Sequence, residues 1–137
     1  ECIAAVGQIM QPVAYLSVKN VLEINRRVLE EFGGDPGLRD RGMLESAVAL
    51  PQSTFDGKDL HTGLAEKAAA YYFHLCANHP FVDGNKRVAV AEAELFLIIN
   101  GRELAAGDEE LENLTLGVAG GRLSKEYVID FFVRFIK

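Results

Sequence analysis

Two long apolar stretches, residues 62–78 and 85–100, are separated by a short polar loop, and this arrangement restricts the fold more than any other feature. The second stretch is apolar almost all round, which is the pattern of a buried central helix. Pro80 disfavours helical backbone at the residue before it, so the first helix is expected to end there. Gly84 supplies a turn just before the second helix. The pattern predicts a helical protein in which the loop of residues 79–87 is held rigidly at the start of its central helix.

The loop reads His-Pro-Phe-Val-Asp-Gly-Asn-Lys-Arg, and it concentrates groups suited to phosphate chemistry. A helix that begins at Asn85 presents free backbone N–H groups and the positive end of its dipole beside Lys86 and Arg87. His79 and Asp83 add a proton acceptor and a carboxylate to the same loop. This mixture favours a phosphate-handling site. The alternative is a polar inter-helix loop in which Asn85 only caps a helix.

The same residues resemble the signature of the Fic/Doc family, roughly His-x-Phe-x-Asp/Glu-Gly-Asn-Gly/Lys-Arg. Seven positions match: His79, Phe81, Asp83, Gly84, Asn85, Lys86 and Arg87. The resemblance extends over residues 15–137 and, in length and in the order of its turns, fits the Doc (death-on-curing) branch. It implies an all-α Fic/Doc helical bundle with a small β-hairpin flap beside the active site.

The resemblance also implies transfer of a group from ATP, with Mg²⁺, to a hydroxyl of a protein target. Such a transfer requires a base, a metal, an electropositive cradle and a means of holding the nucleophile in line. His79 is the expected base, and Asp83 is the expected Mg²⁺ ligand because this ion takes few carboxylates and keeps phosphate oxygens and waters. Phe81 is expected to anchor the loop in the core. The phosphate groups are expected to be held by Gly84, Asn85, Lys86 and Arg87, the last two also belonging to the catalytic set.

Two positions bear on which group is transferred. AMP-transferring members of the family usually have Gly where this chain has Lys86, and a second Arg where it has Val90. In the Doc branch the corresponding Lys accompanies transfer of the γ-phosphoryl group, so the resemblance favours a kinase reaction. Gly84 departs from Doc members that have Ala there, and it keeps AMP transfer open. An alternative of another class is a catalytically idle module that binds an antitoxin or another partner. The intact His79, Asp83 and Arg87 argue against it, because a binding-only role does not require all three.

Residues 51–60 have neither a helical period nor a core composition. Ser53, Thr54 and Phe55 favour extended backbone, and Asp56-Gly57 is a hairpin turn signal. We interpret the segment as an exposed β-hairpin, with an ordinary surface loop as the alternative. By resemblance to the family, Ser53, Thr54 and Phe55 are expected to position the target segment by strand addition beside the active site.

The remaining helices are expected over residues 18–32, 43–50, 108–118 and 124–136, with Ser17 as the N-cap of the first. Glu92 and Glu94 point about 200° apart on a helix, which argues against a shared metal site. We interpret them as surface or locally paired residues. His61 and His74 are expected to be structural or solvent-facing. Cys76 lies in an apolar helical run and is expected in the core.

The chain of 137 residues is long enough for one domain with a sizeable core, to which residues 15–137 are assigned. Residues 1–14 are interpreted as a leader that is disordered, truncated or introduced by cloning. The net charge of −6 argues against direct binding of nucleic acid or of an anionic membrane, and no apolar run reaches the ~18 residues of a membrane span. Two cysteines without disulfide or zinc spacing fit a reducing cytoplasm.

The resemblance to the Doc branch has consequences for partners. Doc toxins act on a hydroxyl of a protein target, elongation factor Tu in that branch, and so arrest translation. Family members that restrain themselves carry an inhibitory helix, Ser/Thr-x-x-x-Glu-Gly/Asn. In this chain residues 62–66 approach that pattern, and Lys67 breaks it. Restraint is therefore expected from another chain, a Phd-type antitoxin.

Overall fold

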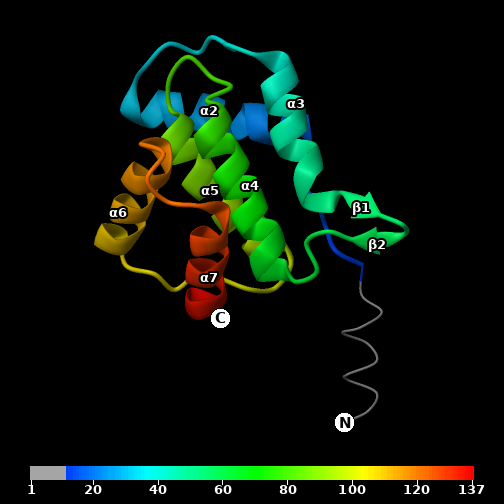
Figure 1. Cartoon of the computed structure of the whole chain (residues 1–137). Helices are drawn as coiled ribbons and strands as arrows, with labels where there is room; N and C mark the ends of the chain where they lie inside the picture. Colours follow the sequence, from blue (N-terminus) through cyan, green and yellow to red (C-terminus); the bar gives the residue numbers. More distant parts are fainter. Residues whose placement is uncertain (1–11) are drawn as a thin grey trace.

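The computed structural model describes residues 12–137, which form a bundle of six α-helices with one small β-hairpin. The elements in chain order are α2 (Val18–Phe32), α3 (Arg41–Ala49), the short 3-10 helix η1 (Leu50–Gln52), β1 (Thr54–Phe55), β2 (Lys58–Asp59), α4 (Leu64–Asn78), α5 (Asn85–Ile99), α6 (Asp108–Ala119) and α7 (Lys125–Phe135). Figure 1 shows α4 and α5 in the middle of the bundle. The predicted all-α class is confirmed.

Helices α4 and α5 form the centre of the core because their apolar side chains meet almost every other helix. α4 packs against α5, α7, α3 and η1, and α5 packs also against α2 and α6. The ring of Tyr71 on α4 lies 5.0 Å from that of Phe96 on α5. The prediction that α5 is buried holds for one stripe of the helix, whereas Ile98 and Ile99 at its end are exposed. The buried residues of that stripe are Val88, Ala89, Glu92, Ala93, Phe96 and Leu97. The start of α5 is therefore attached to the helix pair at the centre of the core.

Helix α2 has the predicted bounds because both of its ends carry local signals. Ser17 accepts a hydrogen bond from the N–H of Asn20, and the side chain of Asn20 accepts one from the N–H of Ser17, which is a capping box. At the other end Gly33 adopts a φ of 82°. The buried residues of α2 are Val21, Asn25 and Leu29.

Glu92 is the main error of the sequence interpretation. It is neither on the surface nor paired: its exposed fraction is 0%, and neither carboxylate oxygen has a hydrogen-bond partner among residues 12–137. Position 92 lies on the stripe of α5 that faces the core, together with Val88, Ala89, Ala93, Phe96 and Leu97, so the residue there is buried whatever its type. Burial raises the pKa of Glu92 well above its ordinary value.

The other single residues largely follow expectation. Cys76 is a free, fully buried thiol in the core, as predicted. His61 is buried and His74 is half-buried, so both have the structural rather than the solvent-facing position. Helix α3 begins two residues earlier than predicted, at Arg41, and Pro51 lies inside η1 instead of closing the helix. Proline is tolerated there because the first N–H groups of a helix have no helical acceptor.

Most of the predicted leader, residues 1–11, lies outside the described residues. Val13 and Ala14, at the end of that leader, pack on the domain. The side chain of Asn100 accepts a hydrogen bond from the N–H of Ala14 and donates one to its carbonyl, both at 2.9 Å. Within the described part, no helix is long and apolar enough to cross a membrane.

The predicted β-hairpin is present. β1 and β2 pair antiparallel around the turn Asp56-Gly57, whose residues have φ values of 54° and 77°. Lys67 on α4 anchors the hairpin, because its buried Nζ donates to Asp59 Oδ2 at 3.0 Å. In Figure 1 the hairpin lies beside the N-terminal end of α4.

Candidate active site

The loop between α4 and α5 leaves one helix and enters the next through left-handed residues. His79 is the C-cap of α4 with φ 48° and ψ 58°, and Gly84 is the N-cap of α5 with φ 86°. A left-handed conformation is usual for glycine at a helix C-terminus and costs any other residue about 1–2 kcal/mol. Two non-glycine residues of the described chain have a positive φ, Asp56 in the hairpin turn and His79, the histidine predicted as the base.

The segment before α3 runs antiparallel to the loop and fixes it. Arg39 donates from Nε to the carbonyl of His79 at 2.6 Å and from Nη2 to the carbonyl of Asn78 at 2.7 Å. The N–H groups of Arg39 and Asp40 both donate to the carbonyl of Pro80, at 2.7 and 3.0 Å. These bonds satisfy carbonyls left open at the end of α4. The half-buried imidazole of His79 makes no hydrogen bond within the described residues, so both ring nitrogens are available for proton transfer.

Asp83 is fixed from two sides by α2 and the turn that follows it. Its Oδ2 accepts a hydrogen bond from the N–H of Asp35 at 2.8 Å, and its carbonyl accepts one from Nδ2 of the buried Asn25 at 3.2 Å. Gly34 allows this close approach, since a Cβ there would lie 3.0 Å from the Cβ of Asp83 and 2.9 Å from Leu29. The second carboxylate oxygen of Asp83 has no partner among residues 12–137.

The donor set around Asp83 fits a Mg²⁺ ion that binds together with a phosphate group. The carboxylate is exposed, with one oxygen engaged by a peptide N–H. Among residues 12–137, no group of three or more His, Cys, Asp or Glu side chains could hold a metal ion by itself. Mg²⁺ commonly takes one or two carboxylates and completes its octahedral shell with phosphate oxygens and water. Its binding at Asp83 would therefore depend on the substrate phosphates.

Asn85 braces the loop from within. Its Oδ1 accepts a hydrogen bond from the N–H of Phe81 and its Nδ2 donates to the carbonyl of Phe81, both at 2.9 Å. The ring of Phe81 is 2% exposed and belongs to the core, so these bonds fasten the loop to the core. The side chain of Asn85, a residue expected to hold phosphate, is therefore partly engaged inside the loop. What Asn85 can still offer to an anion is its backbone N–H and the second N–H of Nδ2.

The start of α5 has the electrostatic character of an anion site. No side chain caps it, and its first intrahelical bond runs from the N–H of Val88 to the carbonyl of Gly84 at 2.9 Å. Four backbone N–H groups have no acceptor among residues 12–137, those of Gly84, Asn85, Lys86 and Arg87. The side chains of Lys86 and Arg87 are exposed beside them. Free donors, the helix dipole and two cations thus favour a bound phosphate.

A groove of about 930 Å³ leads away from this helix start, between α2, α5 and α6. Lys86 and Arg87 lie at one end, and Val90 lines it one helical turn further along α5. Glu94 and Asp108 lie toward the other end, where burial and the neighbouring Asp108 raise the pKa of Glu94. The groove therefore has two cations where it meets the loop, and its lining also includes the carboxylates of Glu31 and Glu112.

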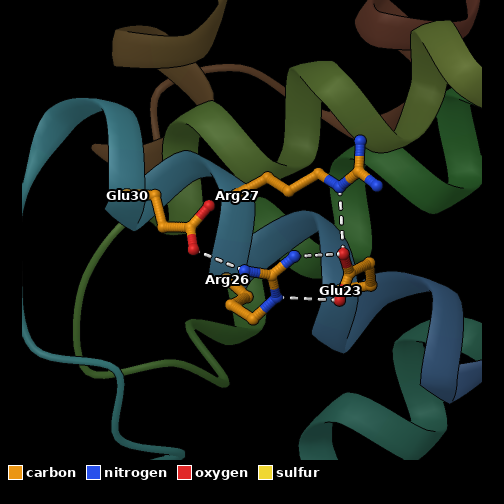
Figure 2. Close-up of polar contacts among 4 residues, drawn as sticks. All are labelled: Glu23, Arg26, Arg27 and Glu30. Carbon is orange, nitrogen blue, oxygen red and sulfur yellow. Dashed lines mark hydrogen bonds and ion pairs between the residues drawn. The ribbon is translucent and has the colours of Figure 1, made fainter.

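The cations of this region differ in what they contact. On the exposed face of α2, Arg26 and Arg27 both hydrogen-bond to Glu23 (Figure 2). These hydrogen bonds lower the pKa of Glu23 to about 2. Such exposed pairs stabilise a fold very little. Lys86 and Arg87 form no ion pair with any carboxylate of residues 12–137, so their charge is available to a ligand.

The predicted flap residues are not brought next to the loop. Ser53, Thr54 and Phe55 lie at the N-terminal end of α4, whereas His79 follows its C-terminal end (Figure 1). The fifteen residues of α4 span about 22 Å at about 1.5 Å per residue. The structure thus places the hairpin at the other end of α4 from His79, because α3 runs from the loop to the hairpin and carries the chain away from the loop. The target-positioning role of Ser53, Thr54 and Phe55 stays a prediction. Phe55 is 75% exposed at the hairpin.

The residues that sequence reasoning missed all lie outside the loop. They are Asn25, Phe32, Asp35 through its peptide N–H, and Arg39. Asn25 does carry a signal, because it occupies a core position of α2 between Val21 and Leu29. Arg39 carries none, since the carbonyls it contacts are about forty positions away in the chain.

Fold and loop together define a helical protein with a candidate anion site at the start of α5. The profile of the Fic/DOC family matches residues 15–97. The "Toxin Doc" of Mycolicibacterium smegmatis is 53% identical over 75 residues, 55% of this chain and 58% of that protein. The "Protein kinase doc" of Escherichia phage P1 is 32% identical over 116 residues, 85% of this chain and 90% of that protein. The chain belongs to the Fic/DOC family.

Proposed function

We propose that the chain is a Doc-like kinase, which transfers the γ-phosphoryl group of ATP to a Ser, Thr or Tyr hydroxyl of a protein target. The observation that carries the proposal is the start of α5, where free N–H groups, Lys86 and Arg87 form an anion site next to His79 and Asp83. The name of the phage relative, "Protein kinase doc", supports the same reaction.

In the proposed reaction the target hydroxyl gives its proton to the imidazole of His79 as its oxygen forms a bond to the γ-phosphorus. The bond between the γ-phosphorus and the oxygen that bridges it to the β-phosphate breaks, and ADP leaves with the electron pair. Lys86, Arg87 and the N–H groups around them hold the phosphate oxygens. Mg²⁺, when bound at Asp83, neutralises part of the phosphate charge. A positioned base contributes about 10²–10⁴-fold to such a rate.

Lys86 and Val90 favour γ-phosphoryl over AMP transfer. Both line the groove on one face of α5, so the cation lies at the start of the helix and an apolar side chain follows one turn later. Gly84 has a backbone reason of its own: its φ of 86° is one that side-chain-bearing residues rarely adopt. The presence of glycine therefore carries no weight in favour of AMP transfer.

We further propose that this chain acts in the cytoplasm as a toxin that arrests translation, with elongation factor Tu as its target. A Phd-type antitoxin restrains it, and the groove between α2, α5 and α6 is the surface we propose for the antitoxin. An amphipathic segment there would cover the apolar walls and place an acidic side chain on Arg87, where it competes with phosphate. The exposed Phe55 contacts the target in this proposal, and about seven extended residues would span the distance from the hairpin to His79.

The reaction is tested with ATP labelled at either the α- or the γ-phosphate, together with Mg²⁺, purified protein and a bacterial lysate. Label from the γ-phosphate is expected on one target protein, and His79→Ala serves as the inactive control. Transfer of the α-label would replace the kinase by an AMP transferase. Absence of transfer from either nucleotide, with correctly folded protein, would contradict both reactions.

A further inference from the structure

Helix α2 ends at Phe32, and the ring of this residue is a platform for Arg87. The guanidinium carbon of Arg87 lies 4.0 Å from the centroid of the ring, within the range of a cation–π contact. Phe32 is 53% exposed, so its ring contributes little to the core. Both residues line the groove. An exposed aromatic side chain thus lies against the cation that the candidate site uses.

Arg87 differs from the other arginine of the groove in what holds it. Arg27 also lines the groove, but its Nε donates to the carboxylate of Glu23 at 2.9 Å (Figure 2). Arg87 forms no ion pair with a carboxylate of residues 12–137, although Glu31 lines the same groove. The ring of Phe32 therefore supports the guanidinium of Arg87 and, unlike the carboxylate beside Arg27, brings no negative charge to it.

The shape of a guanidinium makes this kind of support compatible with ligand binding. Its N–H donors lie in the plane of the group, and its face stacks on aromatic rings. Stacking on Phe32 leaves the in-plane donors of Arg87 free, and such donors match a phosphate group bidentately. A carboxylate partner would occupy the same donors and compete with the phosphate. The ring restricts Arg87 before a phosphate arrives and removes none of its binding capacity.

We propose that Phe32 is a positioning residue, whose ring holds the guanidinium of Arg87 at the end of the groove with its donors ready for a nucleotide phosphate. The inference rests on the proposed function, in which Arg87 binds such a phosphate. Arg87 contacts the phosphate already in the complex with ATP, before the reaction takes place. Loss of the ring is therefore expected to raise the KM for ATP more than it lowers kcat.

The size and the sign of the effect follow from the contact. Without the ring, Arg87 samples other rotamers, and a smaller fraction of the molecules holds the guanidinium where it can bind phosphate. The apparent affinity for MgATP falls in proportion to that fraction. An exposed cation–π contact corresponds to about a two- to fivefold change in an equilibrium constant. Phe32→Leu is therefore expected to weaken MgATP binding by this factor. A ring that instead held Arg87 away from the phosphate would give the opposite sign, tighter binding in Phe32→Leu.

The experiment measures the Kd of MgATP by calorimetry for the wild type and for Phe32→Leu, Phe32→Tyr and Phe32→Trp. The two aromatic variants keep the ring face and are expected to stay near the wild-type value. Arg87→Ala is the reference for loss of the cation. Phe135→Leu is the matched control, because Arg134 lies 5.0 Å from that ring on α7, outside the groove. If Phe135→Leu does not fold, Tyr127→Leu replaces it, at an aromatic side chain that is 49% exposed.

A second readout reports the contact without ATP. In NMR spectra, protons that lie above an aromatic ring resonate upfield. The side-chain protons of Arg87 are therefore expected to be shifted upfield in the wild type, in Phe32→Tyr and in Phe32→Trp. In Phe32→Leu this shift is expected to disappear. Unchanged or tighter MgATP binding in Phe32→Leu, with binding lost in Arg87→Ala, overturns the role of Phe32 and leaves the proposed function intact. Unchanged binding in Arg87→Ala contradicts the phosphate-binding role of Arg87, and the inference falls with it.

Discussion

The buried carboxyl group of Glu92 gives a stability prediction whose sign is fixed by its surroundings. Burial raises its pKa well above the ordinary value of 4.5, and no hydrogen-bond partner among residues 12–137 offsets that burial. From about pH 4.5 upward, the unfolded chain releases a proton that the folded protein keeps. The contribution of Glu92 to the free energy of unfolding is therefore largest below this pH. It falls as the pH rises toward the folded-state pKa.

The substitution Glu92→Gln removes this titration and keeps the shape of the side chain. One proton corresponds to a slope of at most about 1.4 kcal/mol per pH unit, so the variant is expected to gain stability over the wild type as the pH rises from 5 to 7. The difference between the two proteins is the informative quantity. Burial lowers the pKa of His74 from 6.5 to about 4, and this shift makes the wild type more stable as the pH rises between those values.

Urea unfolding followed by circular dichroism at pH 5, 6 and 7 measures the free energy of unfolding of both proteins. Glu92→Leu, which also removes the unpartnered polar group, is expected to be more stable than the wild type at all three pH values, by a margin that grows with pH. Parallel pH curves for the wild type and Glu92→Gln would refute the reasoning, because they would mean that Glu92 is ionised in the folded protein.

His79→Ala is expected to lower transfer by about 10²–10⁴-fold at an unchanged unfolding midpoint, since its imidazole makes no hydrogen bond within the described residues. Equal turnover of variant and wild type would exclude His79 as the base. Asp83→Asn is expected to raise the Mg²⁺ concentration that gives half-maximal activity, and an unchanged value would remove the metal role. Gly84→Ala is expected to lower the free energy of unfolding by about 1 kcal/mol or more, because the φ of 86° strains any side chain. Urea unfolding measures this loss, and an equal stability would show that the turn relaxes.

Features with local causes could be predicted from the sequence. Helix α2 has a capping residue at Ser17 and a terminating glycine at Gly33, so its bounds follow from neighbouring residues. Pro80 likewise marks the end of α4 through its effect on the residue before it. The groups of the candidate site lie in one continuous loop, which is why a motif could assemble them without a structure.

Features that depend on distant residues could not be predicted. Arg39 reaches carbonyls about forty positions away, and Phe32 meets Arg87 only because α2 packs against α5. The place of the hairpin depends on the direction of α3 relative to α4, which no local pattern encodes. Glu92 is different, because the sequence did carry a signal: it lies four residues after Val88 and four before Phe96, on the same face of α5 as these two buried side chains.

The transferred group is tested most directly by the mass of the modified target. Wild-type protein is incubated with ATP, Mg²⁺ and a bacterial lysate, and the target is then isolated and weighed intact. Transfer of the γ-phosphoryl group predicts a gain of about 80 Da. Lys86→Gly is expected to convert some of the product to the AMP adduct. The conversion is expected to be incomplete, because Val90 supplies no second cation. A gain of about 329 Da in the wild-type reaction, the mass of an AMP group, would contradict the kinase assignment.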